Sequence, residues 1–199
     1  MDPPVQSADK MTAAPIIRTE RLILRRWRDS DREQFARMNR DPAVMEHFPA
    51  LLSREESDAL VDRAEAHLEQ HGFGPWAAEL RESQELIGYV GLVIPRFEAV
   101  FTPCVEIGWR LAREHWGKGL ATEGAGTLVR HGFEVLKLPE LVSFTVPANL
   151  RSLRVMEKLG MTHDALDDFD HPSIPADNSL RRHVLYRLKR DDWSGANPL

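Results

Sequence analysis

A glycine-rich stretch just past the middle of the chain holds the residues best suited to bind a charged ligand. It reads Trp116-Gly117-Lys118-Gly119-Leu120-Ala121-Thr122-Glu123 and leads into a segment with helical spacing of apolar residues. Glycine adopts the left-handed backbone conformation at low cost, and the first turn of a helix leaves N–H groups free at its positive end. Such N–H groups bind anions, and Lys118 adds a positive charge. The stretch therefore predicts an anion site, for which a pyrophosphate is the natural ligand.

Two better-known phosphate-binding patterns are absent from the chain. A Walker A loop requires G-x-x-x-x-G-K-[ST], and no stretch has this spacing. A dinucleotide fingerprint that began at Gly117 would require glycine at position 122, where the chain has Thr122. These absences argue against a GTP- or ATP-using enzyme and against a Rossmann domain. A tight strand-to-helix turn that binds no ligand stays open as an alternative.

The elements that must position this stretch alternate between strands and helices. Apolar runs and period-two alternation predict strands at residues 16–27, 74–80, 86–94, 105–111, 141–146 and 183–188. Helices are predicted for a segment carrying Phe35 and Met38, from Ser53 onward, over residues 120–136, and after Asn149. We therefore expect one mixed α/β domain over residues 16–193, between a disordered arm at 1–15 and a tail at 194–199.

The composition argues against several classes of partner. A formal net charge of −5 over 199 residues disfavours a nucleic-acid partner, which needs clustered Lys and Arg. No apolar run approaches the ~20 residues of a membrane helix, so no membrane partner is expected. The single cysteine, Cys104, rules out an intramolecular disulfide and fits a cytoplasmic location. We interpret it as a small buried hydrophobe.

Four motifs, in order along the chain, resemble the GNAT superfamily of N-acetyltransferases. They are Thr19-Glu20-Arg21-Leu22-Ile23-Leu24-Arg25, Glu106-Ile107-Gly108-Trp109, Trp116-x-x-Gly119-x-Ala121, and Asn149-x-x-Ser152-x-x-Val155-x-Glu157-Lys158-Leu159-Gly160-Met161. The third departs from the general pyrophosphate pattern [QR]-x-x-G-x-[GA] at Trp116. With an aromatic residue at this position, the chain resembles the branch of ribosomal-protein alanine N-acetyltransferases (RimJ/RimL-like). The resemblance extends over residues 16–193.

The resemblance implies the GNAT fold, an α/β (α+β mixed) fold whose central mixed, mostly antiparallel sheet is flanked by helices. Two parallel strands splay apart in that fold, and here they are expected at residues 105–111 and 141–146. Acetyl-CoA is then the co-substrate, without a metal, and its pantetheine arm lies in the gap. The implied cofactor-binding residues are Trp109, Arg110, Leu111, Trp116, Gly117, Lys118, Gly119, Leu120, Ala121, Thr122, Asn149 and Ser152.

The resemblance also points to residues for the chemistry. Glu106 is the candidate base, because a partly buried carboxylate near the splay would have a raised pKa; a simple pairing role is the alternative. Ser152 is the candidate donor to the leaving sulfur, and helix capping is its alternative. Many GNAT enzymes place a tyrosine as general acid where this chain has Met156. His171 and His183 are alternative groups for proton transfer.

We therefore expect an acetyl-CoA-dependent N-acetyltransferase acting on a primary amine, either a protein N-terminal amine or a small molecule, with a homodimer left open. The alternative is a CoA-binding module that has lost turnover. His67 and His71 have the spacing of a metal pair but lack the intervening glutamate of H-E-x-x-H, so we interpret them as surface histidines. Trp76 and Phe97 are expected either to line an acceptor pocket or to pack in the core.

Overall fold

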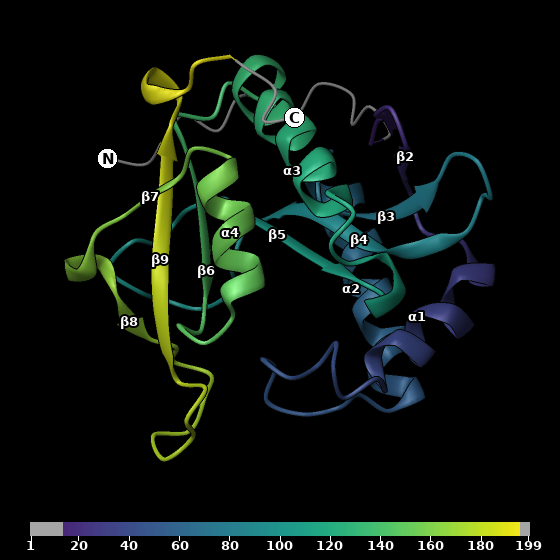
Figure 1. Ribbon diagram of the computed structural model, residues 1–199, viewed down its shortest axis with the longest axis horizontal. Helices are drawn as coiled ribbons and strands as arrows, with labels where there is room; N and C mark the ends of the chain where they lie inside the picture. Colours follow the sequence, from purple (N-terminus) through teal and green to yellow (C-terminus); the bar gives the residue numbers. More distant parts are fainter. Residues whose placement is uncertain (1–13, 196–199) are drawn as a thin grey trace.

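A mixed sheet of nine strands runs through residues 14–195, the part of the chain that the computed structural model describes (Figure 1). The strands are β1 (Ile17–Arg18), β2 (Leu22–Arg25), β3 (Pro75–Leu80), β4 (Leu86–Val93), β5 (Glu106–Leu111), β6 (Glu140–Thr145), β7 (Thr162–His163), β8 (Phe169–Asp170) and β9 (Arg182–Lys189). The α-helices are α1 (Arg32–Asn39), α2 (Arg54–His71), α3 (Leu120–Arg130) and α4 (Leu150–Lys158). A single π-helical turn, η3 (His131–Val135), extends α3, and η2 (Arg113–His115) is a short 3-10 helix.

The sheet diverges between β5 and β6. Its strand order is β1-β2-β3-β4-β5-β6-β9-β7, with β8 added to β9, and the β5–β6 pair is parallel whereas the other pairs are antiparallel. β5 and β6 pair only at Glu106 and Val142, and Figure 1 shows the two strands separating from there. This confirms the mixed, mostly antiparallel sheet with splayed strands. Beyond Glu106, the edge of β5 that faces β6 pairs with no strand among residues 14–195.

Local signals place the helices where the sequence predicts them. Ser53 accepts a hydrogen bond from the Glu56 amide and the Glu56 carboxylate accepts one from the Ser53 amide, so a capping box starts α2. Gly72, with φ of 72°, ends that helix. On α3, a Cβ added to Gly124 would lie 3.1 Å from Val90 of β4, so the missing side chain lets the helix pack closely on the sheet.

The core lies between the sheet and its helices. Trp76 on β3 is completely buried, and its indole N–H donates to the Pro15 carbonyl. On the α1 side, the Phe35 ring packs edge-on against Tyr89 of β4, with 6.3 Å between centroids. Trp76 is therefore a core residue and not part of an acceptor pocket.

The structure corrects two predicted elements. The single strand expected at 16–27 is two short strands, β1 and β2, because the chain turns at Thr19, whose amide donates to the Leu22 carbonyl. The helix expected over 120–136 is α-helical only to Arg130, after which the Leu136 amide bonds to the His131 carbonyl in the π-helical turn. The two-residue strands β7 and β8 were too short to give a sequence pattern.

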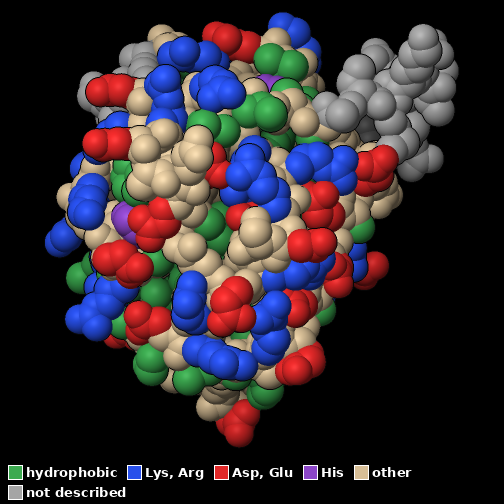
Figure 2. Space-filling view, turned by 90° about the vertical axis from the view of Figure 1, so that its right-hand side faces the viewer, with side chains coloured by type: hydrophobic (Ala, Val, Ile, Leu, Met, Phe, Trp, Pro, Cys, Tyr) green, Lys and Arg blue, Asp and Glu red, His purple; other side chains and the backbone are tan. Residues whose placement is uncertain are grey.

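Charged side chains are interspersed on the surface. Figure 2 shows Lys and Arg mixed with Asp and Glu on the face at the right-hand side of Figure 1. Exposed ion pairs such as Arg182–Asp170, at 3.6 Å, are each worth at most about 1 kcal/mol. A search of residues 14–195 finds no helix with the length and hydropathy to cross a bilayer. The predicted arm at 1–15, apart from its last two residues, and residues 196–199 of the predicted tail lie outside the described part.

Candidate active site

A cavity of ≈ 850 Å³ opens where β5 and β6 diverge. It is lined by residues of β5, β6, the N-terminal ends of α3 and α4, and the loop after α1. Among the residues that the sequence predicts for the site, the following line it: Glu106, Trp109, Arg110, Leu111, Trp116, Gly117, Gly119, Leu120, Ala121, Thr122, Asn149 and Ser152. The structure thus brings together segments that lie more than forty positions apart in the chain.

The glycine-rich turn presents the start of α3 to this cavity. Gly117 and Gly119 have φ of 71° and 78°, in the left-handed region that glycine adopts without strain. Gly119 is the N-cap residue of α3, and its carbonyl accepts the first helical bond from the Glu123 amide. The amides between these two positions are therefore free of helical partners. Lys118 is exposed and is not among the residues that line the cavity, so its contact with the cofactor stays a prediction.

Arg21 and Glu123 hold this turn against β2, a connection that sequence reasoning missed. The buried Glu123 carboxylate accepts a hydrogen bond from the Arg21 side chain at 2.6 Å and another from the Thr19 hydroxyl. These partners hold the pKa of Glu123 below its ordinary value, although burial opposes them. Arg21 also donates to the Lys118 carbonyl at 2.8 Å. Both residues stand in the motifs quoted above, but their pairing spans 102 positions.

Glu106 lies at the point where the strands part. Its side chain follows β5, because a Cβ built on Gly108 would lie 3.5 Å from Glu106 Oε1. Within residues 14–195 no hydrogen bond or ion pair reaches this carboxylate, and burial raises its pKa to about 8. The structure therefore leaves Glu106 without the simple pairing role considered above, and it supplies a group that exchanges a proton near neutral pH.

The start of α4 forms another wall of the cavity. Asn149 Oδ1 accepts from the Ser152 amide at 3.3 Å, and Asn149 Nδ2 donates to the Thr145 hydroxyl at 3.0 Å. Asn149 is thus the N-cap that the sequence predicts, and it lines the cavity as well. The Ser152 hydroxyl has no protein hydrogen-bond partner within the described residues. Met156 is buried against the cavity at the position of the missing tyrosine.

Two histidines line the cavity on the β6 side of the gap: His171, just after β8, and His183, on β9. The rings of His171 and His183 lie 5.2 Å apart, and burial is the main reason that both have pKa values below the ordinary one. The His171 ring also packs on Phe97, with 4.5 Å between centroids. Phe97 belongs to an aromatic group with Phe144 and does not line the cavity itself.

Two further residues of the cavity, Tyr89 and Phe48, were missed from the sequence. Tyr89 of β4 stands opposite Arg110 in the sheet, and Phe48 comes from the loop after α1. Burial raises the pKa of the Tyr89 phenol. The Arg110 side chain, as distinct from its backbone, lies over the Phe48 ring at 3.9 Å from the centroid. The period-two pattern of β5 already placed Arg110 on the face of Glu106, but nothing local indicated Phe48.

The burial of His67, His71 and Cys104 can be compared with the positions predicted for them from the sequence. His67 is buried, not on the surface: its Nδ1 lies 2.8 Å from the Phe73 carbonyl and its Nε2 accepts from the Ile94 amide at 3.1 Å. Its partner in the predicted pair, His71, is half-buried, and its ring is tilted by 47° against that of His67 with 4.4 Å between centroids. Cys104 is half-buried, and burial raises the pKa of its thiol to about 11, which keeps it protonated.

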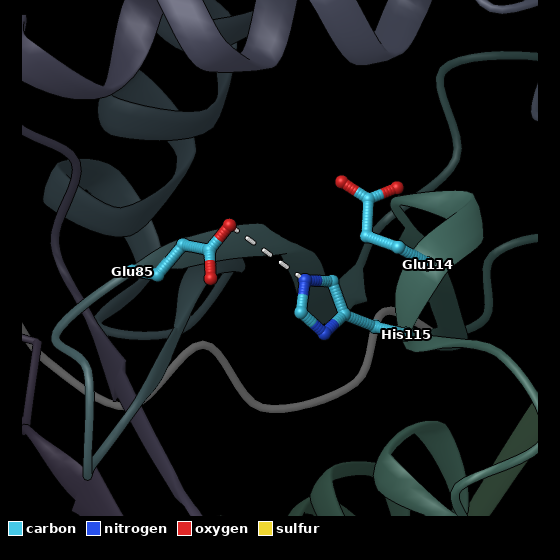
Figure 3. A group of neighbouring side chains, drawn as sticks. All are labelled: Glu85, Glu114 and His115. Carbon is cyan, nitrogen blue, oxygen red and sulfur yellow. Dashed lines mark ion pairs between the residues drawn. The ribbon is translucent and has the colours of Figure 1, made fainter.

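A group of potential metal ligands lies beside the turn that precedes α3. Figure 3 shows the Glu85 and Glu114 carboxylates near the His115 ring, with ligand atoms within 4.8 Å of one another. His115 Nε2 is 3.8 Å from Glu85 Oε1, and this oxygen also accepts from the Gln34 amide at 3.2 Å. Tetrahedral zinc would require ligand atoms about 3.4 Å apart. The group as it stands is thus too open for that ion.

Comparisons with known proteins agree with this architecture. Residues 21–162 match the family described as acetyltransferase (GNAT) domain. FsC-acetyl coenzyme A-N(2)-transacetylase from Aspergillus fumigatus is 29% identical over 187 residues, which are 91% of this chain and 79% of that protein. The crystal structure of a GNAT-family acetyltransferase from Bacillus anthracis superposes with a TM-score of 0.73 at 25% identity, covering 89% of this chain and 99% of that one.

A further solved structure supports the fold likeness to the RimJ branch. Mycobacterium smegmatis RimJ, in complex with CoA-disulfide, superposes with a TM-score of 0.70 over 89% of this chain and 86% of that one, at 18% identity. The resemblance seen in the four sequence motifs is thereby confirmed at the level of fold and family. With its diverging strands, its glycine-rich turn and a family match over most of its length, the chain belongs to the GNAT acetyltransferase family.

Proposed function

We propose that this enzyme transfers an acetyl group from acetyl-CoA to a primary amine by direct attack within a ternary complex. One observation carries the proposal: a single cavity between diverging parallel strands holds both the start of α3 and Glu106. An anion site for the cofactor and a proton acceptor for the amine are what this reaction needs from the protein. The acceptor is either a protein N-terminal amine or a small-molecule amine.

The residues present fit coenzyme A. Backbone N–H groups at the start of α3, around Leu120–Thr122, would bind its pyrophosphate. The unpaired edge of β5 at Trp109–Leu111 would bind the amides of the pantetheine arm, as an added strand does. Trp116 lies under the Arg151 guanidinium, 4.3 Å from its ring centroid, and closes this side of the cavity. The bound co-substrate supplies the activated thioester.

Glu106 is proposed to accept the proton that the amine must lose. An amine enters as the ammonium form, and the Glu106 carboxylate takes one proton and frees the nitrogen lone pair. The nitrogen then bonds to the thioester carbonyl carbon and the carbon–sulfur bond breaks. The nitrogen loses a second proton, which the leaving sulfur takes up. The net products are the amide, the free thiol and one proton that passes from Glu106 to water.

Ser152 is proposed to assist the leaving sulfur. Its hydroxyl has no protein partner within the described residues and lines the cavity at the start of α4. A hydroxyl donor stabilises a developing thiolate because it points a dipole at the new charge. The buried Met156 has no proton to give at the neighbouring position.

Calorimetry and a turnover assay test the proposal in separate steps. Titration with CoA and with acetyl-CoA should give saturable binding of both. A thiol-reactive dye should then detect CoA release that depends on the added amine, over a panel of peptides and small amines. Folded protein that takes up neither CoA nor acetyl-CoA overturns the proposal.

A CoA-binding module without turnover is the second candidate, favoured by the methionine in place of the tyrosine proton donor. Met156 is 1% exposed and lines the cavity. Saturable CoA binding with no thiol release above the buffer rate, for any amine in the panel, would support the module. A cytoplasmic location and a homodimer stay predictions, which fractionation of cells and analytical ultracentrifugation would check.

A further inference from the structure

Arg110 places a positive charge on the wall of the cavity that is formed by β5 and the loop after α1. Successive side chains of β5 point to opposite faces of the sheet, so the Arg110 side chain lies on the same face as Glu106 and Gly108. That face is covered by α1 and the loop after it, since Arg110 Nη1 donates to Asn39 Oδ1 at 2.8 Å and the guanidinium lies on the Phe48 ring. The arginines and the lysine of α4 line the cavity from a different element.

No negative charge compensates this guanidinium. Its polar partner is a neutral amide, its other neighbours are the rings of Phe48 and Tyr89, and Nε is buried without a hydrogen-bond partner. Within residues 14–195 it makes no ion pair with an Asp or Glu. The buried Arg25, by contrast, has carboxylates of Asp31 and Glu79 at 2.7 and 2.6 Å.

A guanidinium that is partly buried, with its Nε shielded from water and no counter-charge, is less stable than a paired one. Burial accordingly lowers the pKa of Arg110, and a nearby Tyr89 only partly opposes this. Glu106, four residues earlier on the strand, is not paired with it. Because the cavity is open to a ligand, the missing charge can come from the acceptor.

We propose, given the acetyl transfer proposed above, that Arg110 binds a carboxylate of the acceptor, so that the substrate is an amine that also carries a carboxylate. One guanidinium matches the single charge of a carboxylate, whereas a phosphate monoester carries close to two. The Cα atoms of Glu106 and Arg110 are about 13 Å apart along the strand, and both side chains line the same cavity. Glu106 Oε1 lies beside Gly108, between these two Cα positions, so the amine and the acid of the acceptor bind close together along this face of β5.

Matched pairs of acceptors test this proposal and distinguish two sources of the carboxylate. γ-Aminobutyrate and its amide represent small molecules, and amidated Asp-Ala-Ala and Asn-Ala-Ala represent polypeptide N-termini. In at least one pair, kcat/KM should favour the acid ten- to a hundredfold, the range of a hydrogen bond to a charged group. Arg110→Met should abolish this preference through KM, and Arg110→Lys should retain part of it.

Arg63→Met is the matched control, because Arg63 is exposed on α2 and does not line the cavity. It removes the same charge and should leave the preference unchanged. Circular dichroism and CoA titration check the folding of each variant; if Arg110→Met does not fold, Arg110→Lys serves as the test. Calorimetric titration of γ-aminobutyrate into the CoA complex gives a second readout that needs no turnover.

The outcomes separate this inference from the proposed function. Wild-type enzyme that acetylates acids and amides equally overturns the carboxylate site while leaving acetyl transfer intact. An Arg110→Met variant that loses both substrates of each pair to the same degree shows that Arg110 only braces the loop after α1, which also overturns the inference. Failure to acetylate any amine overturns the proposed function, and the γ-aminobutyrate titration then decides the carboxylate site alone.

Discussion

Replacing Glu106 with glutamine tests the proposed base with little change of shape. The carboxylate has a pKa of about 8 because of burial, so roughly one side chain in eleven is ionised at pH 7 and roughly ten in eleven at pH 9. A positioned general base contributes about 100- to 10,000-fold. Since only the ionised fraction acts, Glu106→Gln should lower kcat about 10- to 1,000-fold at pH 7 and about ten times more at pH 9.

The assay is CoA release at saturating acetyl-CoA and amine, measured from pH 5.5 to 9.5 for both proteins. The acceptor's own ionisation affects both equally, so the ratio of their kcat values isolates Glu106. This ratio should rise about tenfold per pH unit below pH 7 and level off above pH 8. CoA affinity should stay unchanged. If His171 or His183 is the base instead, the ratio stays near one at every pH and kcat of both proteins rises with a midpoint below 6.5, because the pKa values of these histidines are lowered.

The same substitution has an effect on stability that needs no turnover. The raised pKa means that folded protein holds the Glu106 proton more tightly than unfolded protein, whose carboxyl has its ordinary pKa near 4.5. The stability of the wild type relative to Glu106→Gln is therefore greatest below pH 4.5 and is lost as the pH rises to about 8. Thermal unfolding without ligands should show this trend. A flat kcat ratio together with parallel melting curves would refute the reasoning.

Three other substitutions test the remaining parts of the structure. Gly119→Ala leaves space for the methyl group, but the φ of 78° costs a non-glycine residue about 1–2 kcal/mol. The turn should therefore relax away from the conformation that presents its amides to the cavity, and calorimetry should show CoA affinity weakened about tenfold. Ser152→Ala should lower kcat about tenfold in the CoA-release assay with little change in CoA affinity, since it removes one hydrogen-bond donor; unchanged kcat would exclude Ser152. Arg25→Met removes the buried partner of Asp31 and leaves Glu79 only the exposed Arg28, so it should lower the free energy of unfolding in urea by about 3–5 kcal/mol. The control Arg182→Met, which breaks the exposed pair with Asp170, should cost less than about 1 kcal/mol.

Much of the fold could be predicted because its signals are local. The capping box at Ser53 and Glu56, the N-cap at Asn149 and the left-handed Gly119 each act within a few residues of the chain. The alternation along 105–111 likewise sets which side chains share a face of β5. These features predict the glycine-rich turn at the start of α3 and the placement of Glu106 without knowledge of the neighbouring elements.

The amino-acid sequence by itself thus determined most of the elements, the glycine-rich turn and the family, since the signals for each lie within short stretches of the chain. Only the tertiary structure decided what those elements touch. Arg21 pairs with Glu123 across 102 positions and Arg110 with Asn39 across 71. The tertiary structure also decided that His67 is buried. Hydrogen bonding and desolvation depend on which segments pack together, and no periodicity within a segment encodes that.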